Sequence, residues 1–273
     1  MKRLILGILC LLTSLTALAQ GQVSTRSYRL VDFPDKVTKV VLSGNAFLNS
    51  AIKQEVVMRW TASPFEFCTL AEFETLKESE DYYFLFPAAT RFKGEEQAGI
   101  VSLSLVKGGP EAARGMSAMY EVISLPLASA DGSSGRELTY AGPIIKAIQD
   151  FTLEAMVSEK AAYTRDAWFK ANYDAAKQLY LAREDLSQSV SKPVGSIRLC
   201  SADEADKYFL SHSSGILVSY TVAPENPSAG SYSYQLVFDA ESETLCYLSR
   251  HKITPKSPAG FTLQDIKWLS RKK

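Results

Sequence analysis

One short pattern occurs twice in this sequence and limits the fold more than any other feature. In each copy an alternating apolar run ends in Cys, a hydroxyl residue follows, and Glu stands three positions after that residue. Thr or Ser followed three residues later by Glu is the capping box that begins a helix. Each copy therefore predicts a strand that leads directly into a helix. The copies are Phe65, Phe67, Cys68, Thr69 and Glu72, and Ile197, Leu199, Cys200, Ser201 and Glu204.

A similar order of expected elements follows each junction. Short apolar runs separated by turn residues predict three strands and then a helix in both halves. An Ala-Gly pair, Ala141-Gly142 or Ala259-Gly260, precedes each closing helix, and Pro143 suits the first helical position. We therefore favour an internal duplication over the alternative, a single irregular α+β domain. The expected strands span residues 81–87, 100–106 and 119–127, and residues 215–222, 232–238 and 245–249.

Spacing within single segments makes further predictions. Asn45 is expected to cap a helix that ends before Pro64. A helix is also expected after Asp166, because aromatic residues continue at helical spacing as far as Tyr180. In the strand of residues 100–106, apolar residues alternate with serines, which predicts one solvent-exposed face.

These elements predict an α/β or α+β fold made of two similar units, each a small mixed sheet with packed helices. We expect a leader of residues 1–19, a first unit of residues 20–163 and a second unit of residues 164–273. Without the leader, 273 − 19 = 254 residues remain, and the hydrophobic content is 46%. Such a chain is long and apolar enough to bury a substantial core.

The first residues have the pattern of a secretory signal peptide. Lys2 and Arg3 precede the uncharged apolar residues 4–12, and residues 17–19 read Ala-Leu-Ala, a typical cleavage site. The apolar run is shorter than the ~20 residues of a membrane-spanning helix. We therefore expect an exported protein that is periplasmic, envelope-associated or secreted, with no transmembrane segment after cleavage.

The charge balance argues against a nucleic-acid partner. Without the two basic leader residues, 30 − 2 = 28 Lys and Arg face 30 Asp and Glu, a net charge of about −2. A chain with this charge balance has no excess of basic residues with which to bind the phosphate groups of a nucleic acid.

Three cysteines remain after the leader, and they are the first candidates for chemistry. A thiol at a helix start, as at Cys68 and Cys200, lies near the positive end of the helix dipole, which lowers its pKa. A thiol nucleophile needs a nearby base, however, and the chain has only His212 and His251. We favour structural packing of the cysteines, and a disulfide between Cys200 and Cys246 remains open.

The other polar groups lack the spacing of known catalytic sites. His212 lies in a Ser-rich loop, and His251 is expected at the surface near a strand end. Neither belongs to a zinc-ligand pattern, and no Gly-rich phosphate loop occurs. We therefore assign no catalytic, cofactor-binding or metal-binding residue. Three acidic pairs are interpreted as solvated loop or helix-end groups: Glu95-Glu96, Glu184-Asp185 and Asp203-Glu204.

Aromatic residues give the strongest indication of binding. Tyr82, Tyr83, Tyr232 and Tyr234 stand in expected strands, where their rings can line one face of a sheet. Such a face would suit a glycan, a peptide or another envelope protein. Core packing is the alternative role for the same rings.

Two aromatic-rich runs also carry a resemblance. Together with the leader, the runs Trp60-Thr-Ala-Ser-Pro64-Phe-Glu-Phe67 and Asp81-Tyr-Tyr-Phe-Leu85 resemble uncharacterised exported proteins of Bacteroides-type bacteria, over about the first half of the mature chain. The resemblance implies export and no particular activity. We expect a non-catalytic binding or accessory module of the periplasm or cell envelope. The alternative is an exported enzyme that uses Cys68 or Cys200 as nucleophile or redox centre.

Overall fold

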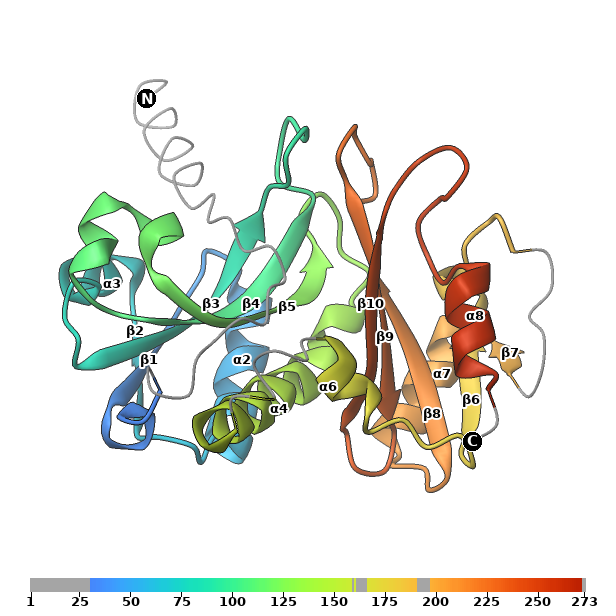
Figure 1. The fold of residues 1–273 in the computed structure, drawn as a ribbon, viewed down its shortest axis with the longest axis horizontal. Coiled ribbons are helices and arrows are strands. Elements are labelled where there is room, and N and C mark those ends of the chain that lie inside the picture. Colours follow the sequence, from blue (N-terminus) through green and yellow to red (C-terminus); the bar gives the residue numbers. More distant parts are fainter. Residues whose placement is uncertain (1–29, 159, 161–165, 191–196, 272–273) are drawn as a thin grey trace.

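The computed structural model describes residues 30–158, 160, 166–190 and 197–271, and the leader and the expected boundary at residues 163–164 lie outside this part. Two five-stranded mixed sheets, each with packed helices, stand side by side (Figure 1). The first sheet contains β1 (Val37–Val41), β2 (Phe65–Cys68), β3 (Tyr82–Thr90), β4 (Ile100–Lys107) and β5 (Tyr120–Ser129). The second contains β6 (Gln178–Ala182), β7 (Arg198–Cys200), β8 (Ile216–Val222), β9 (Tyr232–Asp239) and β10 (Leu245–Lys252).

Both sheets have the same topology. The strand order is β2-β1-β3-β4-β5 in the first sheet and, read from the corresponding edge, β7-β6-β8-β9-β10 in the second. The first three strands of each order are parallel, and the last two are added as antiparallel neighbours. The chain therefore folds as two similar α/β units, as the repeated junction predicts.

Helices connect and cover these strands. They are α2 (Ala46–Arg59), α3 (Leu70–Leu76), α4 (Arg136–Val157), α6 (Asp166–Lys170), α7 (Ala202–Leu210) and α8 (Leu263–Leu269). Short 3-10 turns are η2 (Phe33–Asp35), η3 (Pro110–Arg114), η4 (Met116–Ala118) and η5 (Arg183–Asp185). In the part of the chain that is described, no helix combines the length and apolar content needed to cross a bilayer.

The two predicted strand-to-helix junctions are confirmed. Cys68 pairs with Val41 and Cys200 pairs with Ala182, so each cysteine is the last residue of the strand beside its unit's first strand. Thr69 caps α3 in a complete capping box. At the second junction the Ser201 side chain also accepts from the backbone amide three residues on. There the glutamate side chain, on Glu204, instead accepts a hydrogen bond from the Tyr208 hydroxyl at 3.4 Å.

The expected helix reaching Tyr180 is wrong. α6 ends at Lys170, and Tyr180 lies inside β6, which pairs on both sides with β7 and β8. Aromatic spacing fits a helix in this stretch, but pairing in the middle of the sheet decides its conformation. This strand, which the residue pattern does not indicate, makes the two sheets equivalent.

The first closing helix also differs from its prediction. α4 begins at Arg136 rather than at Pro143, and Pro143 lies inside it. Its N-cap, Gly135, is left-handed and supplies no side-chain oxygen, so the usual capping signal is missing. The apparent correspondence of Ala-Gly pairs is therefore coincidental, because Gly142 is helical whereas Gly260 lies in a loop at φ +104°.

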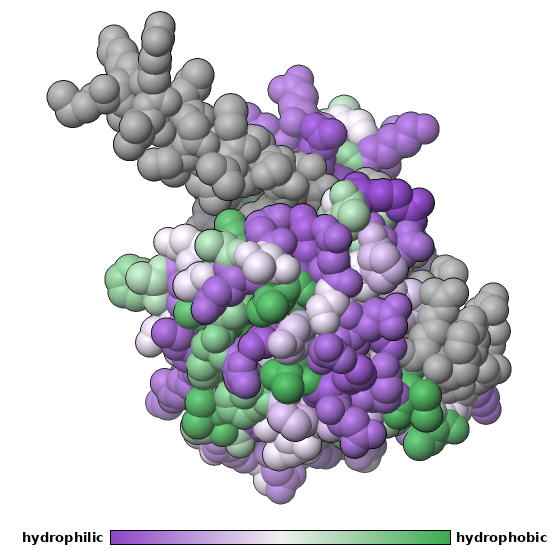
Figure 2. Space-filling view, turned by 90° about the vertical axis from the view of Figure 1, so that its left-hand side faces the viewer, coloured by the Kyte–Doolittle hydropathy of each residue, from purple (hydrophilic) through white to green (hydrophobic). Residues whose placement is uncertain are grey.

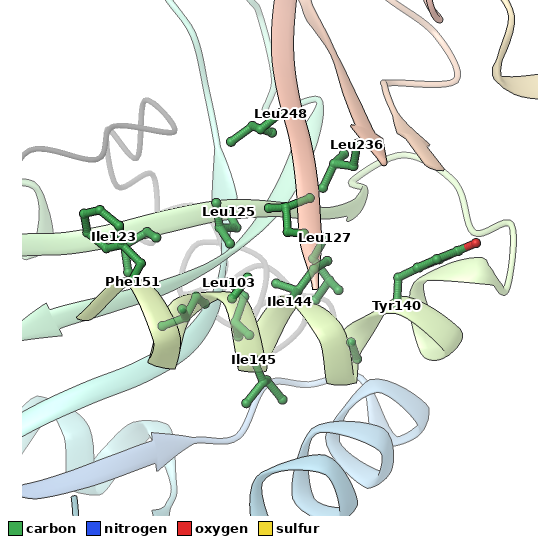
Figure 3. Close-up of a cluster of buried hydrophobic side chains, with 14 of the residues drawn as sticks. Leu103, Ile123, Leu125, Leu127, Tyr140, Ile144, Ile145, Phe151, Leu236 and Leu248 are labelled. Carbon is green, nitrogen blue, oxygen red and sulfur yellow. The ribbon is translucent and has the colours of Figure 1, made fainter. Parts of the chain in front are cut away.

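α4 joins the two units into one core. Its residues Ile144 and Phe151 belong to the same buried cluster as Leu125 of the first sheet, and Leu236 and Leu248 of the second sheet join this cluster beside β5 (Figure 3). The Tyr140 ring of α4 also packs on the Phe238 ring of the second sheet, with centroids 5.2 Å apart. Buried residues of both sheets therefore belong to a single hydrophobic cluster. Two smaller clusters lie on the outer sides, one under α3 and one under α8.

The predicted solvent-exposed face of β4 is wrong as well. Ser102 and Ser104 are buried, and they form hydrogen bonds with Thr90 and Ser124 respectively. Ala112 and Met119, from the connection between β4 and β5, pack on this side of the sheet. Alternation along one strand does not reveal a segment that covers it from elsewhere in the chain.

Candidate functional site

The main candidate site is a pocket of about 890 Å³ in the first unit. It lies where β1 ends, beside the first turn of α2. Apart from Ser43, Gly44 and Asn45, all its lining residues are apolar. They come from the last residue of β1 and the residue after it, from the second half of β3 and from the start of β4. The first turns of α2 and α3 and the turn η4 complete the walls.

The topology explains the position of this pocket. β1 stops at Val41, whereas β3 continues to Thr90, so the last part of β3 extends past its neighbour. α2 joins the cluster shared with α4, and α3 packs with the cluster on the other sheet face. The two helices thus leave the sheet on opposite sides. Ligand crevices of open α/β sheets form at the carboxyl ends of strands where connections diverge in this way.

The polar rim of the pocket is an ordered turn. Ser43 donates through both its amide and its hydroxyl to the Asn49 side chain, at 2.9 and 3.0 Å. The Asn45 side chain accepts from the Leu48 amide at 3.0 Å and caps α2 as predicted. These groups hold the loop between β1 and α2 in place, so the pocket is preformed.

The place in the second unit that corresponds to the pocket is found from the strand pairing, by counting residues in each sheet from the paired cysteine, Cys68 or Cys200. Gly44 then corresponds to Asp185, and Phe86 corresponds to Tyr220. In the second unit the first turns of α4 fill this place. The Tyr140 ring stacks on the Tyr220 ring, with centroids 4.3 Å apart and an interplanar angle of 16°.

A buried ionic network accompanies this stack. The Arg136 guanidinium donates to the Asp185 carboxylate at 3.0 Å and to the Asp206 carboxylate at 2.9 Å. Asp185 also accepts from the Ser219 hydroxyl at 2.6 Å and from the Thr221 amide at 2.9 Å. Burial opposes the charge on Arg136, but the two carboxylates outweigh it and raise the pKa of Arg136. The network therefore locks α4 onto the second sheet.

The three thiols are buried and protonated near neutral pH. Burial raises the pKa of Cys68 and of Cys200 to about 11 each, and that of Cys246 to about 12. The expectation of a lowered pKa at Cys68 and Cys200 is therefore wrong: desolvation is the largest cause at both, and the nearby carboxylates of Glu72 and Glu204 add to it. Thiols of this kind are poor nucleophiles, because the thiolate is the reactive form.

The open question of a Cys200–Cys246 disulfide is settled by the topology. All three cysteines are free, and β7 and β10 lie at opposite edges of the second sheet. Four strand spacings of about 4.8 Å separate them, far beyond the ~7 Å Cα separation that a disulfide can span.

The two histidines contact groups other than the thiols. His212 is exposed beside the Glu243 carboxylate, at 3.5 Å. The expectation that His251 is exposed is wrong, because its ring is half-buried and its Nε2 is 2.9 Å from the Pro258 carbonyl oxygen. In the described part of the chain, no three His, Cys, Asp or Glu side chains come together as a metal site.

The interpretation of the three acidic pairs as solvated groups is wrong for two of them, Glu95-Glu96 and Glu184-Asp185. In each of the first two, one member is buried and the other exposed. Glu95 accepts from the Phe92 amide at 2.7 Å, and Asp185 belongs to the ionic network described above. Both members of the third pair, Asp203 and Glu204, are exposed in the first turn of α7.

The four candidate tyrosines do not form one open face. Tyr83 and Tyr234 are buried in the shared core, and Tyr82 lies on the other face of the first sheet, beneath the Lys39 ammonium group. Tyr232 packs against Phe92, with ring centroids 4.7 Å apart. Core packing therefore explains most of this aromatic content.

Comparison of the chain with protein-family models, with curated proteins and with solved structures finds no match.

The pocket is a feature of the first unit, and it depends on two segments that have no counterpart among the described residues of the second unit. The connection between β4 and β5, residues 108–119, supplies Met116, whereas β9 and β10 are joined by residues 240–244 alone. α2 supplies Leu48, and no helix of similar length lies in residues 183–190 or 197 of the corresponding connection. Unequal connection lengths were thus the one sequence signal that could have indicated the pocket.

Proposed function

We propose that this protein is an exported, non-catalytic binding module whose ligand site is the pocket of the first unit. In this proposal the second unit is a scaffold, because α4 fills its equivalent place. The observation that carries the proposal is the preformed, almost wholly apolar pocket of about 890 Å³. Pockets of about 300–1,000 Å³ with apolar walls and few polar groups are typical of small-molecule sites.

The difference between the two units supports a dedicated site. The second sheet directs the large apolar residues Leu236 and Phe238 into the shared core, where the Phe238 ring lies 5.2 Å from the Tyr140 ring of α4. At the equivalent positions the first sheet has Ser104 and Val106, and the segment of residues 108–119 lies over them. The first unit is therefore covered by its own connection, which leaves a cavity at the end of β1.

The thiol enzyme, kept as the alternative, receives less support. A thiol nucleophile requires a thiolate and a base, but burial raises the pKa of both junction thiols to about 11. Export is proposed from the basic start and apolar run of residues 1–19.

A fluorescence titration with the neutral apolar dye Nile red tests the proposal. Leu70→Glu places a charge at the pocket wall, and Leu263→Glu is its matched control. Both leucines are the first helical residue after a threonine cap, but Leu263 is 47% exposed and lies outside the pocket. The charge opposes burial of an apolar ligand, so it should weaken binding at Leu70 alone.

We expect Leu70→Glu to raise the dye's dissociation constant at least tenfold and Leu263→Glu to leave it within twofold. Circular dichroism must show that both variants are folded. Absence of saturable dye binding to the unmodified protein, or equal binding by both variants, would overturn the proposal.

A further inference from the structure

We infer that the ligand of this pocket is an aliphatic chain, such as the acyl chain of a fatty acid or of a lipid. The inference rests on the proposed function and specifies the ligand class. It follows from the chemistry of the walls, from the packing of their aromatic rings and from the comparison of the two units.

The walls contain no charged side chain. The second unit holds the cationic Arg136 with the Asp185 carboxylate, but Gly44 stands at the corresponding position of the first unit. A cationic ligand would therefore lose its hydration without gaining a counter-ion in the pocket. The polar side chains of the rim, Ser43 and Asn45, already bind within their own turn.

The aromatic residues of the pocket do not provide a slot for a flat ring. Phe73 packs edge-on against Phe84, at 4.9 Å and 86°, and it is tilted by 50° to Phe86. Phe73 and Phe86 are both buried, so these faces are already used in protein contacts. The other apolar walls are aliphatic or, at Met116, a flexible thioether that adapts to varied shapes.

The surface around this end of the molecule favours a small ligand over a protein partner. Apolar and polar side chains are interspersed on the coloured part of this face (Figure 2). A chain could enter the pocket and leave its polar head group in solvent at the rim.

Isothermal titration of the full chain with octyl, decyl and dodecyl maltoside, each below its critical micelle concentration, tests this inference. Each added methylene should tighten binding roughly fourfold, the factor for burying one CH2 group, until the pocket is full. Laurate and lauroyl lysophosphatidylcholine both carry a twelve-carbon acyl chain. Comparing their affinities shows whether the chain comes from a free fatty acid or from a membrane lipid. A tenfold preference for the lysolipid would indicate a membrane lipid, and the reverse would indicate a free fatty acid.

Gly44→Asp gives the first unit the carboxylate that the second unit has at the corresponding position, and Gly44→Asn is the uncharged control. A Cβ atom at this position meets no atom within 4 Å, so both variants fit the fold. We expect Gly44→Asp to weaken dodecyl maltoside binding at least tenfold and Gly44→Asn to weaken it less than threefold. Affinity that does not depend on chain length, or equal binding by the two variants, would overturn the inference. Saturable Nile red binding without competition by the chains would overturn this ligand class and leave the proposed function standing.

Discussion

Arg136 in the first helical turn of α4 donates to the Asp185 carboxylate of the second unit at 3.0 Å. Asp185 ends η5, directly after β6, at the position that is Gly44 in the first unit. The same place in the fold is thus closed by a salt bridge in one unit and open as an apolar pocket in the other. The strand pairing makes the two places equivalent, and different side chains line them.

Removal of the Arg136 charge should destabilise the whole chain. Arg136→Met leaves Asp185 and Asp206 without their cation inside the structure, and breaking a buried pair costs about 3–5 kcal/mol. Urea denaturation measures the change. The control is Arg114→Met, because Arg114 and its partner Glu111 are both exposed and such pairs contribute about 0–1 kcal/mol. Equal effects of the two substitutions would contradict the role of the network.

The thiols should react slowly in the native protein. At pH 8 the pKa values of about 11 to 12 leave very little thiolate, and burial restricts access as well. We expect modification by an aromatic disulfide reagent to be at least a hundredfold slower than in urea. Rapid labelling of Cys68 or Cys200 near neutral pH would instead favour the thiol enzyme.

The same groups make stability depend on pH. Burial raises their pKa above the unfolded value of about 8.5, so the unfolded chain releases these protons first as the pH rises. Their contribution to the free energy of unfolding is therefore present below about pH 8.5 and is lost toward pH 12. Equilibrium unfolding at pH 8 and pH 10 measures it, and Cys246→Ala should reduce the difference. A free energy of unfolding that rises between pH 8 and pH 10 would contradict the raised pKa values of the thiols.

The two junction caps should differ in strength. Thr69 takes part in a complete capping box, whereas Ser201 forms a single cap bond. Loss of a cap costs about 0.5–2 kcal/mol, so Thr69→Ala should lie near the upper end and Ser201→Ala near the lower end. Thermal unfolding of both variants gives the comparison. A larger loss for Ser201→Ala would contradict it.

Local signals predicted the parts of the fold that depend on neighbours in sequence. The caps at Asn45, Thr69 and Ser201 were predicted correctly because the capping side chain and the amide it binds lie three residues apart. β6 was missed because its conformation depends on pairing with strands far along the chain. The early start of α4 was missed because Gly135 has no side chain with which to signal a cap.

The candidate site could not be predicted for a related reason. Its walls come from five separate segments, which the topology brings to the end of β1. Arg136 and Asp185 are similarly distant in sequence, and only the register of the second sheet places them together. The duplicated junction did allow the two places to be compared once the ladders were known.

The most direct test of the central claim is a map of amide chemical-shift changes when dodecyl maltoside is added below its micelle concentration. Our account predicts saturable changes at residues 41–48, 70–73, 86–89 and 116, around the pocket of the first unit. It predicts little change at the equivalent residues 183–186 and 219–221, where α4 already fills the space. Changes centred on the second unit, or spread evenly over both, would contradict it.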